Sequence, residues 1–313
     1  MTTGRRTHLF CHCEESRYGG TTWQSCFGTE EVTDPPPPRW GRERVGVDLD
    51  GPPTLVLPHK GGGDKLQMIL IGTSGYNYPH WWNGLFYPSD LPQRKWLEFY
   101  AQYFDSVELN VSFYRLPKKE VFGGWYKRTP KGFSFAVKGN RFITHIKRLK
   151  DCREALSLLF DHASPLKEKL GVLLWQLPPR FEFQKERLEE FCVLLSTLPR
   201  AKRLRHAFEF RDESWFCEEA FRVLEEFNFA FCIAHGSGLP FMERVTSNFA
   251  YLRLHGGEVL YGSNYSDKEL KGWAEKIENW TEKRKDVVIY FNNDTYAFAI
   301  KNALTLKKLV HSH

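Results

Sequence analysis

Charged and amide side chains follow most of the short apolar runs in this 313-residue sequence. Four of them could transfer protons or attack a carbonyl carbon: Glu108, Lys138, Glu209 and His255. Carboxylates and imidazoles move protons, and a lysine amine becomes a nucleophile when burial lowers its pKa. Ten further residues could bind and orient a substrate: Thr73, Ser74, Asn110, Tyr114, Arg115, Gln176, Arg211, Arg253, Asn292 and Asn293.

Two arginines of this set, Arg211 and Arg253, indicate an anionic substrate. Guanidinium groups match the geometry of oxyanions, and the net charge of +6 (44 basic less 38 acidic residues) permits an anionic ligand. We therefore expect an enzyme that acts on a small anionic metabolite, such as a phosphorylated sugar or a carboxylate. Neither a metal nor another cofactor is expected, and isomerisation, a lyase step and hydrolysis all stay open.

Two other interpretations of the same residues also stay open. Glu108, Glu209 and His255 could hold Zn²⁺ or Mn²⁺ in an isomerase or an endonuclease-like hydrolase, because carboxylates and imidazoles suit these ions. The neighbouring lysine and arginines argue against this, because they neutralise the carboxylates. Alternatively, the charges form a layer of buried salt bridges, and the protein is a non-enzymatic ligand-binding or interaction module.

Neither a nucleic acid nor a membrane is expected as a partner. A short basic stripe precedes the fifth predicted strand, but it suits a solvated loop equally well (Arg200, Lys202, Arg203 and Arg205). No run of eighteen apolar residues exists, and the first thirty residues contain no continuous apolar segment typical of a secretion signal. Seven scattered cysteines suit reduced thiols, so we expect a cytoplasmic protein.

Short β-branched and apolar runs alternate with amphipathic stretches along the chain after residue 67. Apolar residues recur at helical spacing in these stretches, as at Leu270, Trp273 and Ile277, which follow a capping box at Ser266 and Glu269. We predict strands at Ile69–Thr73, Ser106–Asn110, Phe133–Lys138, Val172–Gln176, His206–Phe210, Phe229–Ile233, Phe249–Leu254 and Val287–Phe291.

Eight strands that alternate with helices predict a parallel sheet, which right-handed crossovers close into a barrel. From Met68 onward 246 residues remain (313 − 67), close to the ~250 of a (β/α)₈ barrel. We therefore expect an α/β protein with a single (β/α)₈ TIM-barrel-like domain at residues 68–313. Chemistry in such barrels lies at the C-terminal strand ends, so the candidate residues should converge there. Glu108 and Asn110 share strand parity, as do Glu209 with Arg211 and Arg253 with His255.

Residues 1–67 differ from the rest of the chain. They hold 7 of the 17 prolines and 10 of the 24 glycines and show no hydrophobic periodicity. Such a composition cannot bury enough apolar surface to offset chain entropy, which predicts a disordered tail. We interpret the tail as translated bacterial intergenic sequence ahead of a biological start at Met68.

Several short motifs, taken together, resemble the domain-of-unknown-function 72 (YecE-like) family. They include Gly72-Thr73-Ser74-Gly75-Tyr76, Val107-Glu108-Leu109-Asn110, Phe135-Ala136-Val137-Lys138, Gln176-Leu177-Pro178-Pro179, Phe208-Glu209-Phe210-Arg211, Arg253-Leu254-His255-Gly256 and Phe291-Asn292-Asn293. The resemblance runs from Ile69 to Val310 in the expected order. It implies a TIM-barrel-like fold and no established reaction. A further family segment contains His145, which we expect to be a loop histidine bonded to the backbone.

Overall fold

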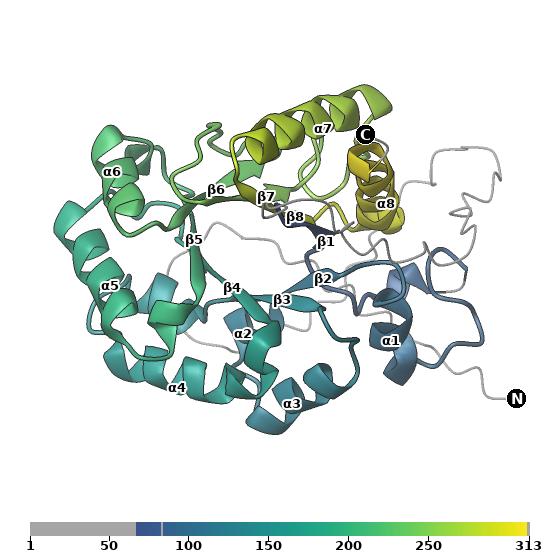
Figure 1. The fold of residues 1–313 in the computed structure, drawn as a ribbon, viewed down its shortest axis with the longest axis horizontal. Helices are drawn as coiled ribbons and strands as arrows, with labels where there is room; N and C mark the ends of the chain where they lie inside the picture. Colours follow the sequence, from purple (N-terminus) through teal and green to yellow (C-terminus); the bar gives the residue numbers. More distant parts are fainter. Residues whose placement is uncertain (1–66, 83, 312–313) are drawn as a thin grey trace, which may run out of the picture. The chain divides into compact units, whose positions relative to one another are not determined.

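Eight short strands form one parallel sheet in the computed structural model, which describes residues 67–82 and 84–311 (Figure 1). Every predicted strand is present, and each of its ends lies within two residues of the prediction. The strands are β1 (Ile69–Thr73), β2 (Ser106–Leu109), β3 (Ser134–Lys138), β4 (Leu170–Gln176), β5 (Arg205–Glu209), β6 (Ala230–His235), β7 (Phe249–Leu254) and β8 (Asp286–Phe291).

The sheet closes into a TIM-barrel-like cylinder, as the alternation of strands and helices predicts. From β2 to β8 each strand pairs in parallel with the next strand along the chain, and β8 pairs with β1. Between β1 and β2 the structure shows one isolated parallel bridge, from Ser74 to Glu108. Closure therefore depends at this seam on side chains as well as on the backbone.

Helices surround the strands on the outside of the barrel (Figure 1). The α-helices within the described residues are α1 (Trp96–Tyr100), α2 (Val111–Tyr114), α3 (Lys119–Lys127), α4 (Arg153–Ala163), α5 (Lys185–Thr197), α6 (Glu218–Glu226), α7 (Asp267–Glu282) and α8 (Phe298–His311). The capping box at Ser266 and Glu269 is present at the start of α7.

The prediction of a helix after every strand is wrong at one place, the connection from β6 to β7. Residues 236–248 contain no helix. Gly236, Gly238 and Pro240 lie in this segment, and glycine and proline disfavour helix formation.

Alternate strand residues pack into two separate apolar clusters. Residues such as Leu174 and Tyr251 belong to a small cluster inside the barrel, whereas their neighbours Trp175 and Leu252 pack in the larger cluster that includes the helices. This period of two follows from the pleat of each strand. It decides which polar side chains at the strand ends point into the barrel.

A tyrosine hydroxyl joins β1 to β2 at the seam. The backbone N–H of Thr73 donates to the Tyr100 hydroxyl at 2.9 Å, and this hydroxyl donates to the carbonyl of Ser106 at 3.1 Å. The strands approach closely here, because a Cβ atom on Gly72 would lie 2.2 Å from the Ser106 carbonyl oxygen. Only glycine fits between the two strands at this point.

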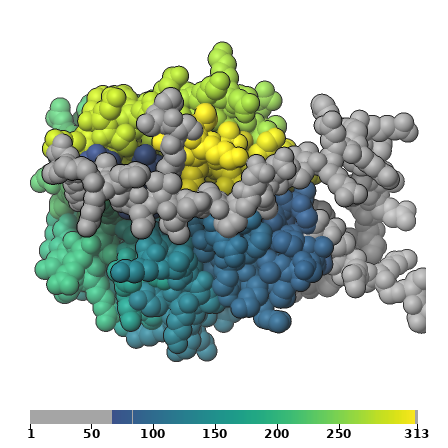
Figure 2. Space-filling model, turned by 45° about the vertical axis from the view of Figure 1, so that its right-hand side comes forward, coloured from purple at the N-terminus to yellow at the C-terminus, as the bar shows by residue number. Residues whose placement is uncertain are grey.

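The last helix also bridges the seam. In Figure 2, α8 (yellow) lies against the blue segment that leads into β2. The Lys307 ammonium of α8 donates to Asp105 Oδ2 at 2.7 Å and to the Tyr103 carbonyl at 3.1 Å. The first and last units of the barrel are thereby tied together next to the Gly72 position.

The predicted disordered tail lies, apart from Gln67, outside the described residues. Within the described ranges, no helix is long and apolar enough to cross a membrane.

We expect Gly72→Ala to destabilise the barrel by roughly 2–4 kcal/mol, because its methyl group must displace β2. Gly272→Ala is the matched control, because nothing lies within 4 Å of a Cβ added at this site in α7. The control should stabilise the protein by up to about 1 kcal/mol. Urea unfolding of both variants measures these differences, and a neutral Gly72→Ala would contradict the tight seam.

Candidate functional site

Six charged or titratable side chains from four strands and their ends gather at the C-terminal end of the barrel. We call them the charged cluster: Glu108, Lys138, Glu209, Arg211, Arg253 and His255. All four predicted catalytic residues and two of the three predicted arginines, Arg211 and Arg253, belong to it. Strand parity places them together, because they continue the inward-facing positions of β2, β3, β5 and β7.

Arg253 occupies the centre of the charged cluster and is almost fully buried. Its Nη1 donates to Glu209 Oε2 at 2.6 Å. Its Nη2 and Nε donate to Glu108 Oε1 at 2.9 and 3.2 Å. The guanidinium thus joins carboxylates from β2 and β5, and its pKa lies well above the ordinary value: burial lowers it, but the two carboxylates raise it more.

Glu108 is fully buried and accepts hydrogen bonds from three elements. Tyr251 of β7 donates its hydroxyl to Oε2 at 2.6 Å, and Ser74 donates to Oε1. Ser74 in turn accepts hydrogen bonds from Asn110 Nδ2 at 2.7 Å and from Arg253 Nη2 at 3.1 Å. The predicted binding residues Ser74 and Asn110 therefore lie in the same network as the carboxylate.

Glu209 is held ionised by two arginines. Burial by itself would raise the pKa of this carboxyl, but the charges of Arg211 and Arg253 hold it well below its ordinary range. Arg211 Nε donates to Glu209 Oε1 at 2.5 Å. Gln176, another predicted binding residue, is buried beside Glu209, because these two residues are partners in the β4–β5 register.

Lys138 differs from the other members of the charged cluster. Its side chain is 8% exposed, and its Nζ makes no hydrogen bond or ion pair with any residue that the structure describes. The Nζ lies 4.1 Å from the centroid of the Phe113 ring. Burial, assisted by the charge of Arg253, lowers the pKa of Lys138 to about 7, although Glu209 and Glu108 act in the opposite direction. A large fraction of this amine is therefore neutral at neutral pH.

His255 is fully buried and neutral. Burial, followed by the charges of Arg253 and Arg211, holds the pKa of its imidazole well below the ordinary value. Asn292 Nδ2, which can only donate, lies 3.0 Å from His255 Nδ1, so the ring proton is on Nε2. This Nε2 has no hydrogen-bond partner in the described structure and lies 3.9 Å from Glu209 Oε1. His255 thus presents a buried, unused hydrogen-bond donor.

Four of the predicted binding residues lie away from the charged cluster. Thr73 points to the opposite face of β1 and bonds with Tyr100 at the seam. Asn293 donates to the Ser263 carbonyl and to Asn302, and so holds the loop after β7. Tyr114, the last residue of α2, and Arg115, which follows it, are both exposed. Adjacent positions in a strand face opposite sides, which explains Thr73, and residues beyond a strand end carry no strand parity.

Two neighbours of the charged cluster, Tyr251 and His145, were absent from the predicted set. Tyr251 shares strand parity with Arg253 two residues later, so its contact with Glu108 could have been expected from β7. His145 lies in a π-helical turn (Phe142–Ile146), 5.0 Å from the Phe113 ring that Lys138 also contacts. Its Nδ1 lies 2.9 Å from Thr144 Oγ1, so the expected bond to the backbone is not the one found.

The donor set at Glu108, Glu209 and His255 does not fit a divalent cation. Arginines already bond both carboxylates, and a cation placed there would meet their positive charge. Across residues 67–82 and 84–311, no group of three or more histidine, cysteine, aspartate or glutamate side chains could hold a metal ion.

The exposed aromatic side chains also mark the C-terminal end of the barrel. Those of the described residues all lie within ten residues after the end of a strand: Trp82, Tyr114, Phe142, Phe241 and Tyr296. Exposed aromatic surface is typical of ligand or partner sites.

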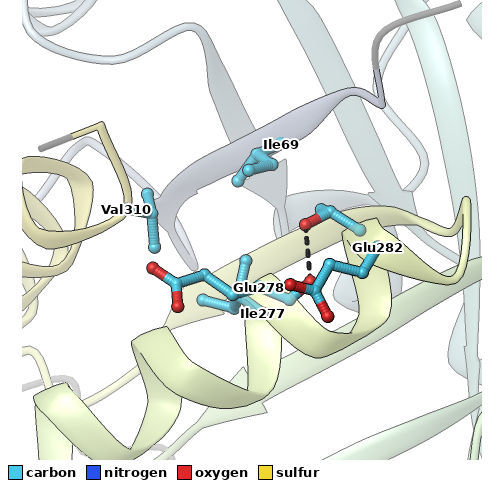
Figure 3. Close-up of a pocket in the computed structure, with 6 residues that line it drawn as sticks. Ile69, Ile277, Glu278, Glu282 and Val310 are labelled. Carbon is cyan, nitrogen blue, oxygen red and sulfur yellow. Dashed lines mark hydrogen bonds between the residues drawn. The ribbon is translucent and has the colours of Figure 1, made fainter. Parts of the chain in front are cut away.

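Two surface hollows lie at the opposite, N-terminal end. The one in Figure 3 has a volume of about 370 Å³ and lies beside Ile69, the first residue of β1. Its walls combine Ile277 and Val310 with the carboxylates of Glu278 and Glu282, which would repel an anion. The second, about 200 Å³, lies next to the start of β5. Neither contains a residue of the charged cluster.

We expect Glu209→Gln to destabilise the protein by about 3–5 kcal/mol at neutral pH, because it leaves buried arginines without their partner. Glu209 has a lowered pKa, so its stabilisation is present above the ordinary glutamate pKa of roughly 4.3 and is lost as pH falls below it. The variant should therefore lose stability less steeply on acidification. The control Glu189→Gln, at an exposed pair with Lys185, should change stability by under about 1 kcal/mol. Urea unfolding at several pH values measures these differences. Equal losses of stability in the two variants would contradict the buried pairing of Glu209 with the arginines.

Lys138→Met should stabilise the protein at about pH 6, because it removes a buried, unpaired ammonium. The pKa of Lys138 is about 7 in the folded chain and is the ordinary lysine value in the unfolded chain. Between about pH 7 and about pH 10, the unfolded chain therefore binds one more proton than the folded chain. Wild-type stability should rise through this window by at most about 1.4 kcal/mol per pH unit, and the variant's advantage should shrink. Lys271→Met, on the exposed face of α7, should keep the wild-type pH dependence.

Comparison with known proteins supports the resemblance seen in the motifs. Over residues 70–313 the chain matches the family described as "Protein of unknown function DUF72". The UPF0759 protein YunF of Bacillus subtilis is 27% identical over 274 residues, which cover 78% of this chain and 95% of YunF. The UPF0759 protein YecE of Escherichia coli is 34% identical over 114 residues, covering 36% of this chain and 39% of YecE.

A solved structure gives the same result. The crystal structure of a DUF72 family protein from Thermotoga maritima superposes with a TM-score of 0.69 and 30% identity, covering 78% of this chain and 99% of that protein. Because the family match covers residues 70–313, most of the chain, this protein belongs to the DUF72 family of proteins of unknown function.

Proposed function

We propose that this protein is an enzyme that acts on a small anionic carbonyl compound, with Lys138 as its nucleophile. One observation carries the proposal: a buried lysine at a barrel strand end has no hydrogen-bond or ion-pair partner among the described residues and a pKa of about 7. A buried lysine without a charge partner is unfavourable for folding, so a functional reason for keeping it is needed.

The chemistry begins with attack by the neutral amine on the substrate carbonyl carbon. The resulting carbinolamine takes up a proton, releases water and becomes an iminium ion, in which Lys138 Nζ is doubly bonded to the former carbonyl carbon. The iminium withdraws electrons from the neighbouring carbon, which favours loss of a proton or cleavage of a carbon–carbon bond there. Isomerisation and lyase steps suit such an intermediate better than hydrolysis.

The charge balance of the site favours an anionic substrate. Once the iminium has formed, Lys138, Arg211 and Arg253 carry three positive charges against the two negative charges of Glu108 and Glu209. The arginines bond to the carboxylates, so we assign Arg253 to positioning them rather than to clamping the substrate. The positive charge of the iminium is then left for an anionic group of the substrate to balance.

His255 is the group that we assign to the substrate oxygen. Its Nε2–H is buried and unpartnered, and Asn292 holds the tautomer that presents this proton. A neutral imidazole donor can stabilise the oxygen as the carbonyl reacts. Glu209 stays ionised between two arginines, so it does not serve as a proton donor.

The protein could instead be a non-enzymatic ligand-binding module, and the saturated pairing of Glu108, Glu209 and Arg253 favours that candidate.

In either role we propose that it works in the cytoplasm. The cysteines within the described ranges are free thiols, as expected in a reducing compartment (Cys152, Cys192, Cys217 and Cys232).

Reductive trapping tests the proposed nucleophile. We expect sodium borohydride to fix a carbonyl compound to Lys138 as a secondary amine, visible as a mass increase on the peptide that contains this residue. Pyruvate and dihydroxyacetone phosphate serve as probes. Lys138→Met should give no adduct, whereas Lys271→Met should react like the wild type. Binding of both probes without any adduct would favour the module over the enzyme.

A further inference from the structure

We infer that the turn after β3, residues 139–150, is the subsite for the anionic group of the substrate, and that this group is a phosphate monoester. This inference rests on the proposed function for the identity of the substrate, whereas the anion subsite itself has separate evidence. We call this segment the β3 turn.

The β3 turn concentrates positive charge around one imidazole. Four cationic side chains act on His145: Lys138, Arg141, Arg211 and Arg148. Among them, Arg141 and Arg148 make no hydrogen bond or ion pair with any described residue, and Arg148 only lies over the Phe181 ring, at 5.5 Å. Residues 139–150 contain no acidic side chain, and Asp151 is the next one along the chain.

A second observation points into the same place. Lys138 is more than nine-tenths buried, lacks a partner among the residues described, and reaches over the Phe113 ring that also contacts His145. The amine and the imidazole therefore lie beside one aromatic ring, with the two unpaired arginines on the same turn. A substrate whose anionic group is bound by these arginines would bring its carbonyl carbon towards the Lys138 amine.

The backbone of the β3 turn is held in place before any ligand binds. Asn140 donates its amide to the Ser112 carbonyl at 2.8 Å, and its Oδ1 accepts the N–H of Phe142 at 2.9 Å. The π-helical turn follows, and Arg148 then adopts a φ of 46°, in the left-handed region. Such strained geometry is typical of positions that hold a side chain for a ligand.

The number of uncompensated charges favours a dianion. Arg141, Arg148 and the iminium at Lys138 would present three positive charges, whereas a carboxylate brings one negative charge. A phosphate monoester carries between one and a half and two negative charges at neutral pH. Its three terminal oxygens also match several guanidinium donors at once.

His145 is a reporter for the subsite that does not depend on Lys138 chemistry. Burial, followed by the neighbouring cations, lowers the pKa of His145 to about 4. A bound phosphate would bring negative charge beside the ring and raise this pKa. Thr144 lies on the Nδ1 side of the imidazole at 2.9 Å, so Nε2 is the atom left to face the ligand.

The experiment is an NMR titration of protein with isotope-labelled histidine, in which the His145 resonance is assigned by its loss in His145→Asn. We expect inorganic phosphate to raise the His145 pKa by at least about one unit relative to sodium chloride at equal ionic strength. The double variant Arg141→Gln/Arg148→Gln should abolish the rise. Arg203→Gln, an exposed arginine at the other end of the barrel, should retain it. Equal responses to phosphate and chloride, or a response that persists in the double variant, would overturn the subsite.

A matched substrate pair then separates this inference from the proposed function. Dihydroxyacetone phosphate should be trapped on Lys138 at concentrations at least about ten times lower than dihydroxyacetone, and the double variant should erase this ratio. Equal trapping of the two compounds by the wild type would refute the phosphate preference while leaving the nucleophile in place. Absence of trapping together with a normal His145 response would refute the nucleophile and leave the anion subsite standing.

Discussion

The guanidinium of Arg253, bonded at once to two buried carboxylates, is the interaction on which the C-terminal end of this barrel depends. It joins β7 to Glu108 on β2 and to Glu209 on β5, and so ties three separate parts of the barrel wall together. In a low-dielectric interior each of these charges is tolerable only because the others are present. Removal of any one of these three side chains would therefore leave a buried charge without its partner.

Burial, together with that arrangement, gives Lys138 its lowered pKa. Both carboxylates that could neutralise its ammonium are already bonded to arginines, and Arg253 adds a nearby positive charge. The amine is left without an ion pair among the described residues, against Phe113 and near the β3 turn. The proposed nucleophile thus lies at the edge of a filled barrel, and the centre of the barrel serves as a rigid electrostatic support.

Much of the fold was predictable because strand alternation and the helical spacing of apolar residues are both local patterns. Alternation along each strand decides whether a side chain faces the barrel interior, so Glu108, Glu209 and Arg253 could be assigned to one place from their strand positions alone. Thr73 lies away from the charged cluster for the same reason, since it faces the opposite way and bonds to Tyr100. The missing helix between β6 and β7 also had a local signal in Gly236, Gly238 and Pro240, which the regular alternation of units outweighed.

The sequence by itself determined the eight strands, the barrel and the set of charges at one end, because these follow from residue spacing. Only the tertiary structure decided which opposite charges pair. Arg253 meets a carboxylate 145 residues away, and the choice depends on how strands far apart in the chain converge inside the barrel. For the same reason no local pattern could show that Lys138 has no partner among the described residues, or that His145 lies beside it across Phe113. Pairing depends on distances in space, and strand-end loops bring those distances about through packing that leaves no period in the sequence.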